Sequence, residues 1–369
     1  MSVEKKTKKI LMVASFSPPT TGQSIASDAV FLLLQNKAKV ERVNLSKPTF
    51  KAGLDSLSRV LKVLMIFRDI YLKSRDVDVV YYTISQSLAG GLKDVLIFLL
   101  LYNRLHKFVL HSHGFGIKRE FLDRFVVIKR IYKHLISKMK KVIVLGPSHQ
   151  EYLKEILTDE KTEIVYNFSD DGLFIPEDYI LKKFELAAHE KYNFLFLSNL
   201  LPGKGHNELV NAFDKIFPNE TDDAQLTFAG GFRSKIEEEE FIKLISGKNN
   251  IKYRGIVNYQ GKSQLYREAH FFCLPTYYAF EGQPIAIIEA MASGCVIITT
   301  DHAGITDIVE DANGSFVIPK SVDNLASTIE NMIQDFSKMS GIGLLNRKKA
   351  SKHFSQRAFE ARICEILLG

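Results

Sequence analysis

The sequence predicts an α/β protein with two domains, each built around a parallel β-sheet. Two observations support this. The chain has 369 residues, more than one hydrophobic core usually organises. Along it, short apolar runs rich in β-branched and aromatic residues alternate with stretches of helical periodicity, which is the pattern of βαβ units. Each apolar run is short enough to be one buried strand of a parallel sheet.

The predicted strands fall into two groups. In the first half of the chain we expect strands at 10–16, 79–83, 108–111, 142–145 and 164–166. In the second half we expect them at 194–198, 226–229, 251–255, 271–274, 296–299 and 316–318. A polar stretch from 169 to about 192 separates the two groups. We therefore predict domains at 1–168 and 169–353, followed by a helical segment at 354–369.

The composition fits a soluble globular protein, with 46% hydrophobic and 25% charged residues. The three cysteines, Cys273, Cys295 and Cys364, are odd in number and far apart. We therefore expect free thiols, with neither a disulfide framework nor a metal site. No signal peptide is recognisable, and the longest dense apolar run, 95–102, is much shorter than the ~20 residues of a membrane span. We expect a chain that does not cross a bilayer.

The charge is unevenly distributed along the chain. Residues 1–168 carry 28 Lys and Arg against 15 Asp and Glu, while the remainder carries 21 against 27. The first half is therefore strongly basic and the second half acidic. This asymmetry suggests that the first half alone meets an anionic surface.

The most informative motif begins at Glu281 and ends at Glu289, reading Glu-Gly-Gln-Pro-Ile-Ala-Ile-Ile-Glu. Gly282 and Pro284 suit the start of a helix, whose free N–H groups can bind an anion such as phosphate. The two carboxylates can accept hydrogen bonds from sugar hydroxyls. The motif therefore favours a nucleotide sugar as ligand. The alternative is an ordinary amphipathic helix with two surface carboxylates.

Three further loops follow predicted strands. Ser198 to Gly205 places Lys204 between two glycines before a helix, which suits contact with a phosphate. Ser17 to Ser24 opens a helix but has too few glycines for a dinucleotide fingerprint. His111-Ser112-His113-Gly114 ends the third predicted strand, where α/β folds bind ligands.

The stretch 281–300 resembles the Glu-x7-Glu signature of the family-4 retaining glycosyltransferases. The resemblance implies the GT-B fold of two facing Rossmann-like domains, with a C-terminal helix that crosses back to the first domain. It also implies an N-terminal acceptor domain and a C-terminal donor domain. The roles that it implies are donor-sugar contact for Glu281, ribose contact for Glu289 and diphosphate contact for Lys204 and for the backbone at Gly282, Gln283 and Pro284. Gly22 would face the donor from the first domain, and His113 would line the site beside the donor sugar as a catalytic residue together with Glu281.

The chain departs from the family pattern at one phosphate-binding position. Asn199 stands where the family has an arginine, which removes a bidentate phosphate partner. Either Arg233 or Arg254 is a possible substitute, and we favour Arg233. Asp76-Val77-Asp78 looks like a metal-binding Asp-x-Asp, but it precedes a buried strand and is expected to cap it. We therefore expect no metal or other cofactor, only the nucleotide-diphosphate sugar as co-substrate.

Residues 117–141 combine apolar residues at helical spacing with nine lysines and arginines. A basic amphipathic helix of this kind suits an anionic membrane surface, and we expect Lys129, Arg130 and Lys133 to face it. The alternative is an ordinary surface helix with a solvated basic face.

Together these features predict a retaining glycosyltransferase. Its acceptor would be a lipid-linked saccharide in surface polysaccharide or O-antigen assembly, and its location the inner face of the cytoplasmic membrane. A glycosyltransferase with a soluble acceptor is the main alternative, and a nucleotide-sugar epimerase is a weaker one. A basic nucleic-acid-binding protein is the alternative from another class, but the chain lacks a recognised nucleic-acid-binding module.

Overall fold

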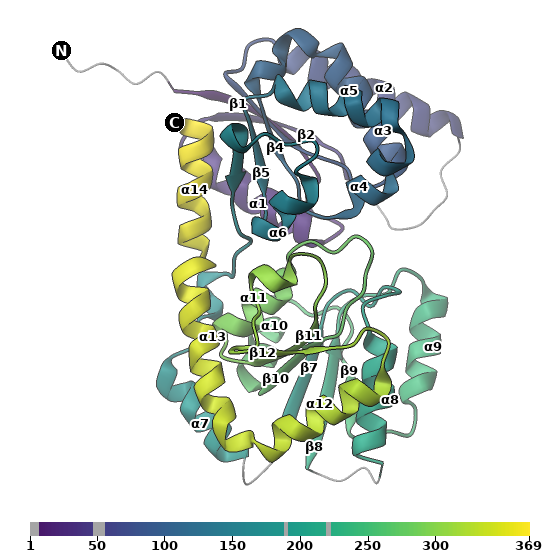
Figure 1. Ribbon diagram of the computed structural model, residues 1–369, viewed down its shortest axis with the longest axis vertical. Helices are drawn as coiled ribbons and strands as arrows, with labels where there is room; N and C mark the ends of the chain where they lie inside the picture. The colour runs from purple at the N-terminus through teal and green to yellow at the C-terminus, as the bar shows by residue number, and fades with distance from the viewer. Residues whose placement is uncertain (1–6, 47–55, 188–190, 219–222) are drawn as a thin grey trace, which may run out of the picture. The chain divides into compact units, whose positions relative to one another are not determined.

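The computed structural model describes residues 7–46, 56–187, 191–218 and 223–369. The chain forms two compact units (Figure 1). The first contains Met1–Tyr166 together with Phe359–Gly369, and the second contains Asn167–Ala358. Helix α14 (Gln356–Leu368) therefore begins in the second unit and ends in the first, as the predicted fold requires. Each unit is described below by itself.

The first unit contains a six-stranded parallel sheet in the order β2-β1-β3-β4-β5-β6. Register is regular, with Ile10 opposite Val79 between the adjacent strands β1 and β3. The strands of this sheet are β1 (Lys9–Ala14), β2 (Lys39–Asn44), β3 (Val79–Thr83), β4 (Phe108–His111), β5 (Lys141–Val144) and β6 (Thr162–Ile164).

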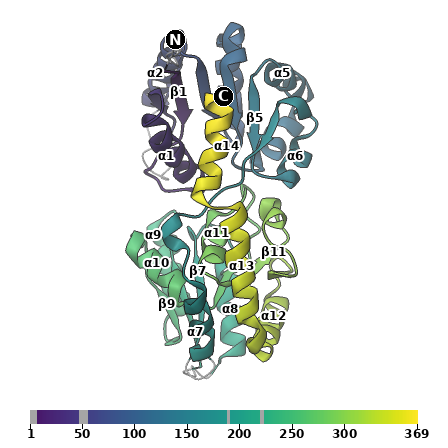
Figure 2. The ribbon, with the colours of Figure 1, turned by 90° about the vertical axis from the view of Figure 1, so that its left-hand side faces the viewer.

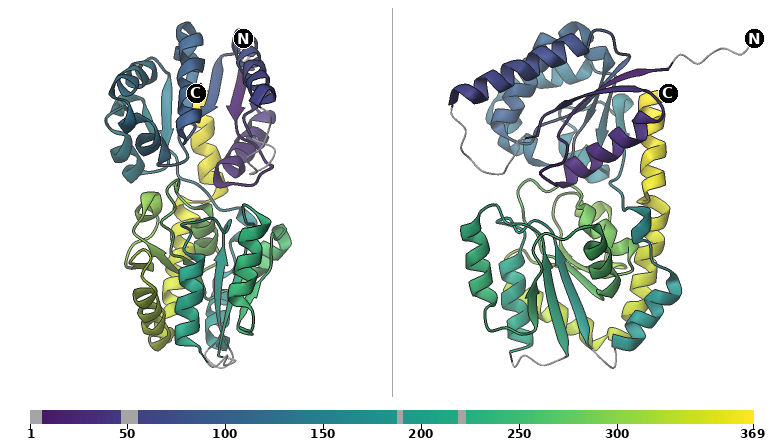
Figure 3. Two further views of the ribbon diagram at one scale, coloured as in Figure 1. Left: turned by 90° about the vertical axis from the view of Figure 1, so that its right-hand side faces the viewer. Right: turned by 180° about the vertical axis from the view of Figure 1, so that it is seen from behind.

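The helices of the first unit cover both faces of its sheet. Its elements are α1 (Gly22–Gln35), α2 (Ser56–Lys73), α3 (Leu88–Leu100), η1 (Tyr102–Lys107), α4 (Gly116–Glu120), η2 (Leu122–Arg124), α5 (Val126–Ser137), α6 (Pro147–Leu153) and η3 (Asp159–Lys161). One apolar cluster joins the inner sides of α2, α3, α5 and α6 to the strands, so these helices share one face. Helix α1 lies on the other face with α14, as the rear view shows (Figure 3).

The second unit repeats this architecture with strand order β12-β11-β10-β7-β8-β9. Its strands are β7 (Tyr192–Leu197), β8 (Ala224–Ala229), β9 (Ile251–Tyr253), β10 (Phe271–Leu274), β11 (Val296–Thr300) and β12 (Gly314–Val317). Its helices are α7 (Glu177–Ala187), α8 (His206–Ile216), α9 (Lys235–Ile245), α10 (Tyr259–Glu268), α11 (Ile285–Ala292), α12 (Val322–Gln334) and α13 (Met339–His353). Short 3₁₀ segments are η4 (Asp171–Leu173), η5 (Ala303–Asp307) and η6 (Phe336–Lys338). Figure 2 shows α13 continuing toward α14.

The order of the second sheet determines where its ligand site can form. The chain runs outward through β7, β8 and β9, then returns to the other side of β7 to form β10. Strands β7 and β10 are direct neighbours, with Phe271 opposite Phe194. Loops that leave these two strands turn in opposite directions at their carboxyl ends. This topological switch point is where open α/β sheets bind ligands.

Most predicted strands agree with the structure to within two or three residues at each end, but three expectations were wrong. The predicted helix at 117–141 is three short elements, α4, η2 and α5. Phe121 (φ −132°, ψ −60°) and Phe125 (φ −140°, ψ 93°) leave the helical region and interrupt it. Strand β2 was not expected, and α7 occupies the polar stretch that was expected only to separate the domains.

Candidate functional site

The loops after β7 and β10 meet in a buried ion pair. Lys204 Nζ lies 2.7 Å from Glu281 Oε2, and the two residues are only 8% and 7% exposed. The hydroxyl of Thr276 donates a second hydrogen bond to the same carboxylate oxygen, at 2.9 Å. The Lys204 ammonium also lies 5.1 Å from the ring centre of Tyr278. The switch point therefore holds one cation and one carboxylate that were both predicted to contact the donor.

Two glycines let the Lys204 loop approach the β10 loop closely. Gly203 and Gly205 have φ angles of 94° and 80°, values that residues with a side chain rarely adopt. A Cβ on Gly205 would lie 2.3 Å from the carbonyl oxygen of Pro275. The Gly203 carbonyl also accepts a 2.7 Å hydrogen bond from the Tyr277 backbone. Replacing either glycine would therefore move Lys204 away from Glu281.

Helix α11 begins at Ile285, shortly after Glu281, with Pro284 as its N-cap. No side chain caps this N-terminus, and its first turn carries no acidic residue. Gln283 supports the turn: its side-chain oxygen accepts from the Asn167 backbone, and its carbonyl accepts from the Asn167 side chain, both at 2.7 Å. The Gly282 carbonyl accepts from the Gly304 backbone. The side chain of Gln283 thus holds the loop in place, while the helix N-terminus suits an anion.

Glu289 lies in α11, where both of its carboxylate oxygens have partners on α10. Lys262 Nζ lies 2.5 Å from Oε1, and the Tyr266 hydroxyl donates to Oε2 at 3.0 Å. Burial raises the pKa of Glu289, and the Lys262 ammonium and the Tyr266 hydrogen bond oppose that rise. Lys262 is therefore the charge that favours the ionised form of Glu289.

Asp170 and Tyr259 complete the surroundings of Glu289. The Tyr259 hydroxyl donates to Asp170 at 2.6 Å, and this hydrogen bond together with burial raises the pKa of Tyr259 to about 12. Lys262 Nζ lies 5.6 Å from the Tyr259 ring centre. The sequence reasoning missed Lys262, Tyr266, Thr276 and Asp170. For Lys262 and Tyr266, the spacing with Tyr259 on one helix face is a signal that could have drawn attention to them, whereas Thr276 and Asp170 lie outside that helix.

The position of the missing family arginine remains polar. Asn199 is half-buried at the end of β7, beside Gly231 at the end of β8. Arg233 is exposed and paired with Glu237 at 2.7 Å. Burial raises the pKa of Tyr278, whose ring lies beside Lys204, and the charge of Arg233 opposes that rise. Arg254 is also exposed, beyond the end of β9. Of the two arginines, Arg233 is therefore the one whose charge acts on a residue beside Lys204.

In the first unit, Gly22 and His113 belong to loops at the carboxyl ends of β1 and β4. Gly22 is the first residue of α1, behind a capping box formed by Thr21 and Ser24. His113 packs against His111 with ring centres 3.8 Å apart. Burial lowers the pKa of His113 to about 3, so its ring is neutral near pH 7. Among the described residues, neither ring nitrogen of His113 has a hydrogen-bond partner.

His111 and His149 have structural partners instead. The Tyr81 hydroxyl lies 2.7 Å from His111 Nδ1, and the Leu145 N–H donates to His149 Nδ1 at 3.3 Å. Burial lowers the pKa of both imidazoles, to about 3 for His149. His113 is thus the histidine of this group with unused hydrogen-bonding capacity on both nitrogens.

The three predicted membrane-facing cations differ in the structure. Lys129 forms ion pairs with Asp123 and Glu155, and its side chain is 25% exposed. Arg130 and Lys133 are exposed, and no ion pair of either is found within the described ranges. Lys129 is therefore occupied by ion pairs within its own unit, whereas Arg130 and Lys133 remain exposed for the membrane contact that was predicted.

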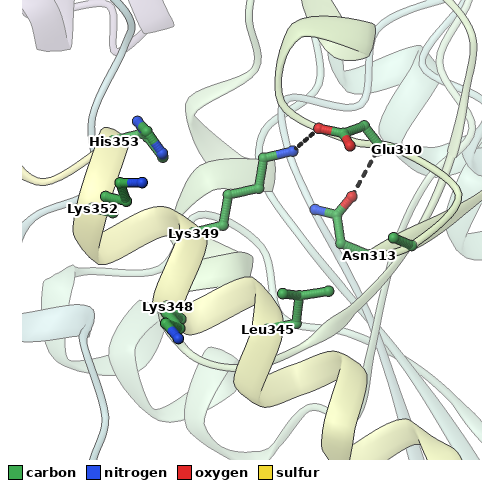
Figure 4. Close-up of a pocket in the computed structure, with 8 residues that line it drawn as sticks. Glu310, Asn313, Leu345, Lys348, Lys349, Lys352 and His353 are labelled. Atoms are coloured by element: carbon green, nitrogen blue, oxygen red, sulfur yellow. Dashed lines mark hydrogen bonds and ion pairs between the residues drawn. The ribbon is translucent and has the colours of Figure 1, made fainter.

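A separate cavity of about 290 Å³ lies in the second unit between α13 and residues 310–313. Figure 4 shows Lys349 reaching Glu310 across it, and Asn313 bonded to the Glu310 backbone. The cavity shares no residue with the Lys204, Glu281 and Glu289 site.

Over the described part of the chain, no group of three or more His, Cys, Asp or Glu side chains could hold a metal ion. The same part contains no helix long and apolar enough to span a membrane.

Comparison with known proteins agrees with this architecture. The sequence model of the family described as "Glycosyl transferases group 1" matches residues 179–348. An uncharacterized glycosyltransferase of Methanocaldococcus jannaschii is 26% identical over 212 residues, which is 53% of this chain and 51% of the relative. The capsular polysaccharide biosynthesis glycosyltransferase CapM of Staphylococcus aureus is 27% identical over 190 residues, 48% of each chain. The matched stretch thus spans about half the length of these relatives.

Among solved structures, Anabaena Alr3699/HepE in complex with UDP superposes with a TM-score of 0.72 at 19% identity, covering 98% of this chain and 100% of that one. This likeness establishes the GT-B fold for the chain. With that fold, the chain falls in the GT-B class of α/β proteins. Residues 179–348 are similar to the glycosyl transferases group 1 family, whose sequence model they match.

Proposed function

We propose that this protein is a retaining glycosyltransferase that moves a sugar from a nucleotide-diphosphate donor to a hydroxyl of a glycan acceptor. The observation that carries the proposal is the buried Lys204–Glu281 pair at the β7/β10 switch point, next to the N-terminus of α11. A diphosphate can replace Glu281 as the partner of Lys204. The Glu281 carboxylate then becomes available to accept hydrogen bonds from the donor sugar.

The second unit would bind the donor. In this proposal Lys204 and the first amides of α11 contact the diphosphate, and Glu289 accepts from the ribose hydroxyls. As the bond to the sugar breaks, negative charge grows on the leaving diphosphate. Fixed positive groups that already face it stabilise that charge without reorganising, which is usually the largest catalytic contribution. No metal is needed for this step in our proposal, and transfer in excess EDTA tests that directly.

The first unit would bind the acceptor. His113 supports this role because its neutral ring is buried with two unused nitrogens, which can donate to one hydroxyl and accept from another. Leaving two such atoms unpaired costs about 1–3 kcal/mol each, so a ligand hydroxyl there is favourable. We also propose that Gly22 lines the donor site and that Arg233 substitutes for the missing arginine, because of where these residues lie in their units.

The proposed acceptor is a lipid-linked saccharide used in surface polysaccharide assembly at the inner face of the cytoplasmic membrane. The basic first unit supports this, because lipid-linked acceptors lie at an anionic surface. A soluble acceptor is the alternative, whereas a nucleic acid is not expected. Transfer from a labelled donor to membrane extracts, compared with transfer to water-soluble oligosaccharides, separates the two acceptors. Product formed only with the water-soluble oligosaccharides would contradict the proposal of a lipid-linked acceptor.

A further inference from the structure

The outer side of helix α3 is apolar where a surface helix is normally polar. Leu92, Leu96, Leu99 and Leu100 lie at helical spacing along one stripe, and each is 43–55% exposed. The opposite side, including Phe98, packs into the core of the first unit. A helix that is apolar on all sides normally has protein or lipid around it. Helix α3 has solvent on one side.

No charged group of α3 interrupts this stripe. The only charged residues of the helix are Lys93 and Asp94, which bond to each other at 2.6 Å. Asp94 is fully buried and also accepts from the Tyr82 hydroxyl at 2.6 Å. Both charges are therefore used inside the unit, and the leucine stripe carries no charge of its own.

Neighbouring helices extend the same surface. On α5, Val126 and Val127 are 64% and 68% exposed, and on α2, Leu64 and Met65 are 57% and 52% exposed. These helices and α3 cover one face of the sheet. They are tied together by η1, where Arg104 donates to the Tyr71 carbonyl of α2 and Tyr102 bonds to His134 of α5. The exposed apolar side chains thus belong to one continuous helical layer.

The opposite face of the same sheet provides a contrast. Helix α1 lies there, and Leu32 is its one large hydrophobic side chain that is strongly exposed, at 63%. Scattered single residues of this kind are normal on protein surfaces, whereas a group spread over three adjacent helices marks an interaction site. The apolar surface is therefore specific to the α2, α3 and α5 layer.

We infer that this layer is a membrane-binding surface that inserts apolar side chains into the interface of an anionic bilayer. The distribution of charge favours a bilayer, rather than a second copy of the chain, as the partner of this surface. Arg130 and Lys133 are exposed beside Val126 and Val127 on α5, and residues 1–168 carry 28 basic against 15 acidic residues. A second copy of the chain would bring these like charges together, whereas anionic headgroups neutralise them. The sequence alone predicted only the electrostatic part of this contact.

The contact should therefore have two separable components. Basic residues attract the unit to anionic headgroups, and salt screens that attraction. The leucine stripe of α3 contributes through removal of apolar area from water, which salt does not screen. Neither component depends on sugar transfer, although together they would bring the first unit to a lipid-linked acceptor. Hence the inference and the proposed function can fail independently.

Fluorescence gives a direct test, because the natural chain contains no tryptophan. Leu96→Trp places a single reporter on the α3 stripe, and Leu32→Trp is the matched control on the opposite face. With vesicles of phosphatidylethanolamine and phosphatidylglycerol, we expect a blue shift and quenching by brominated lipid for the first variant only. Unchanged emission of Leu96→Trp would overturn the inference. A concentration-dependent blue shift without vesicles would also overturn it, by showing that a second copy covers this face.

Cosedimentation with the same vesicles gives the second arm. The pair Leu96→Glu and Leu99→Glu should reduce binding at least tenfold, while Leu32→Glu should leave it unchanged. Arg130→Glu with Lys133→Glu should weaken binding at low salt, and residual wild-type binding should persist in 1 M salt, where the screening length is about 3 Å. Equal binding by wild type and the leucine pair would contradict insertion. Glu281→Gln should still bind vesicles, which separates this test from the transfer reaction.

Discussion

Lys204 Nζ and Glu281 Oε2 lie 2.7 Å apart although 77 residues separate them in sequence. The contact forms because β7 and β10 are adjacent at the switch point of the second sheet, so that their loops meet. Breaking one partner of such a buried pair leaves the other charge uncompensated, which makes both residues sensitive reporters of the site. Four of the following predictions use this pair or Glu289 on α11.

Glu281→Gln should abolish transfer while preserving donor binding. The amide keeps the size of the side chain, but it no longer offers a carboxylate to the donor sugar. It also frees Lys204 for the diphosphate, so the affinity for a nucleoside diphosphate should stay equal or rise. Turnover and calorimetric binding measured on the same preparation check both parts. Turnover near the wild-type value would refute the assignment of Glu281.

Lys204→Ala should weaken binding of a nucleoside diphosphate by about 1.5–3 kcal/mol, the value of a hydrogen bond to a charged group. Binding of the matching nucleoside should change little, because it has no phosphate. Lys215→Ala is the control, since Lys215 forms an exposed pair with Asp323 in the same unit. An equal loss for nucleoside and diphosphate would mean that Lys204 acts only by supporting the fold.

Lys262→Met should move the pH dependence of donor binding upward. Burial raises the pKa of Glu289 and Lys262 lowers it, so removal of Lys262 raises it further. Donor binding that needs the ionised carboxylate is present above this pKa and is lost as pH falls through it. The loss should therefore begin at a higher pH in Lys262→Met than in wild type or Lys262→Arg. If Lys262→Met and wild type lose donor affinity at the same pH between about pH 5 and 8, this role of Lys262 is contradicted.

The first unit should lose stability as the pH falls below 6.5. Burial lowers the pKa of His113 and of His149 to about 3, below the ordinary value of 6.5. The unfolded state therefore binds more protons between these values, and each histidine reduces the free energy of unfolding by up to about 1.4 kcal/mol per pH unit. Hydrogen exchange of the β4 and β5 amides measures this locally.

Matched variants identify the source of that pH dependence. His149→Gln should give a shallower decline, because one buried imidazole no longer needs to remain neutral. His353→Gln is the control, since His353 is exposed at the end of α13. A decline that is equally steep in His149→Gln and wild type would assign the effect to other groups.

The sequence allowed the strands to be predicted well where they are buried on both faces. Val79–Thr83, Phe108–His111 and Phe271–Leu274 have the predicted bounds because an uninterrupted apolar run is required there. Strand β2 escaped prediction because it lies at the sheet edge, where only Val43 is buried. The helix at 117–141 was predicted too long because Phe121 and Phe125 fit helical spacing although their backbone turns away.

The site residues that could be predicted from the sequence are those that lie in local motifs. Lys204 and Glu281 stand in recognisable loops, and Glu289 stands in the helix that follows the second loop. Their partners do not: Lys262 reaches Glu289 from α10, and Thr276 reaches Glu281 from the end of β10. Similarly, the pairing of Lys129 with Glu155 depends on tertiary packing that helix periodicity does not encode. Long-range packing also decides that the α3 leucines face solvent.

Binding of nucleoside diphosphates to the intact chain tests the central claim most directly. Thermal shift across uridine, guanosine, adenosine and thymidine diphosphates should reveal at least one that stabilises the wild type, by about 2.7 kcal/mol at a hundredfold excess over Kd. The same compound should give a much smaller shift with Lys204→Ala and with Glu289→Ala, whereas Lys215→Ala should respond like wild type. The absence of any shift across the panel, or an equal shift in all four proteins, would contradict a nucleotide-sugar site at the β7/β10 switch point.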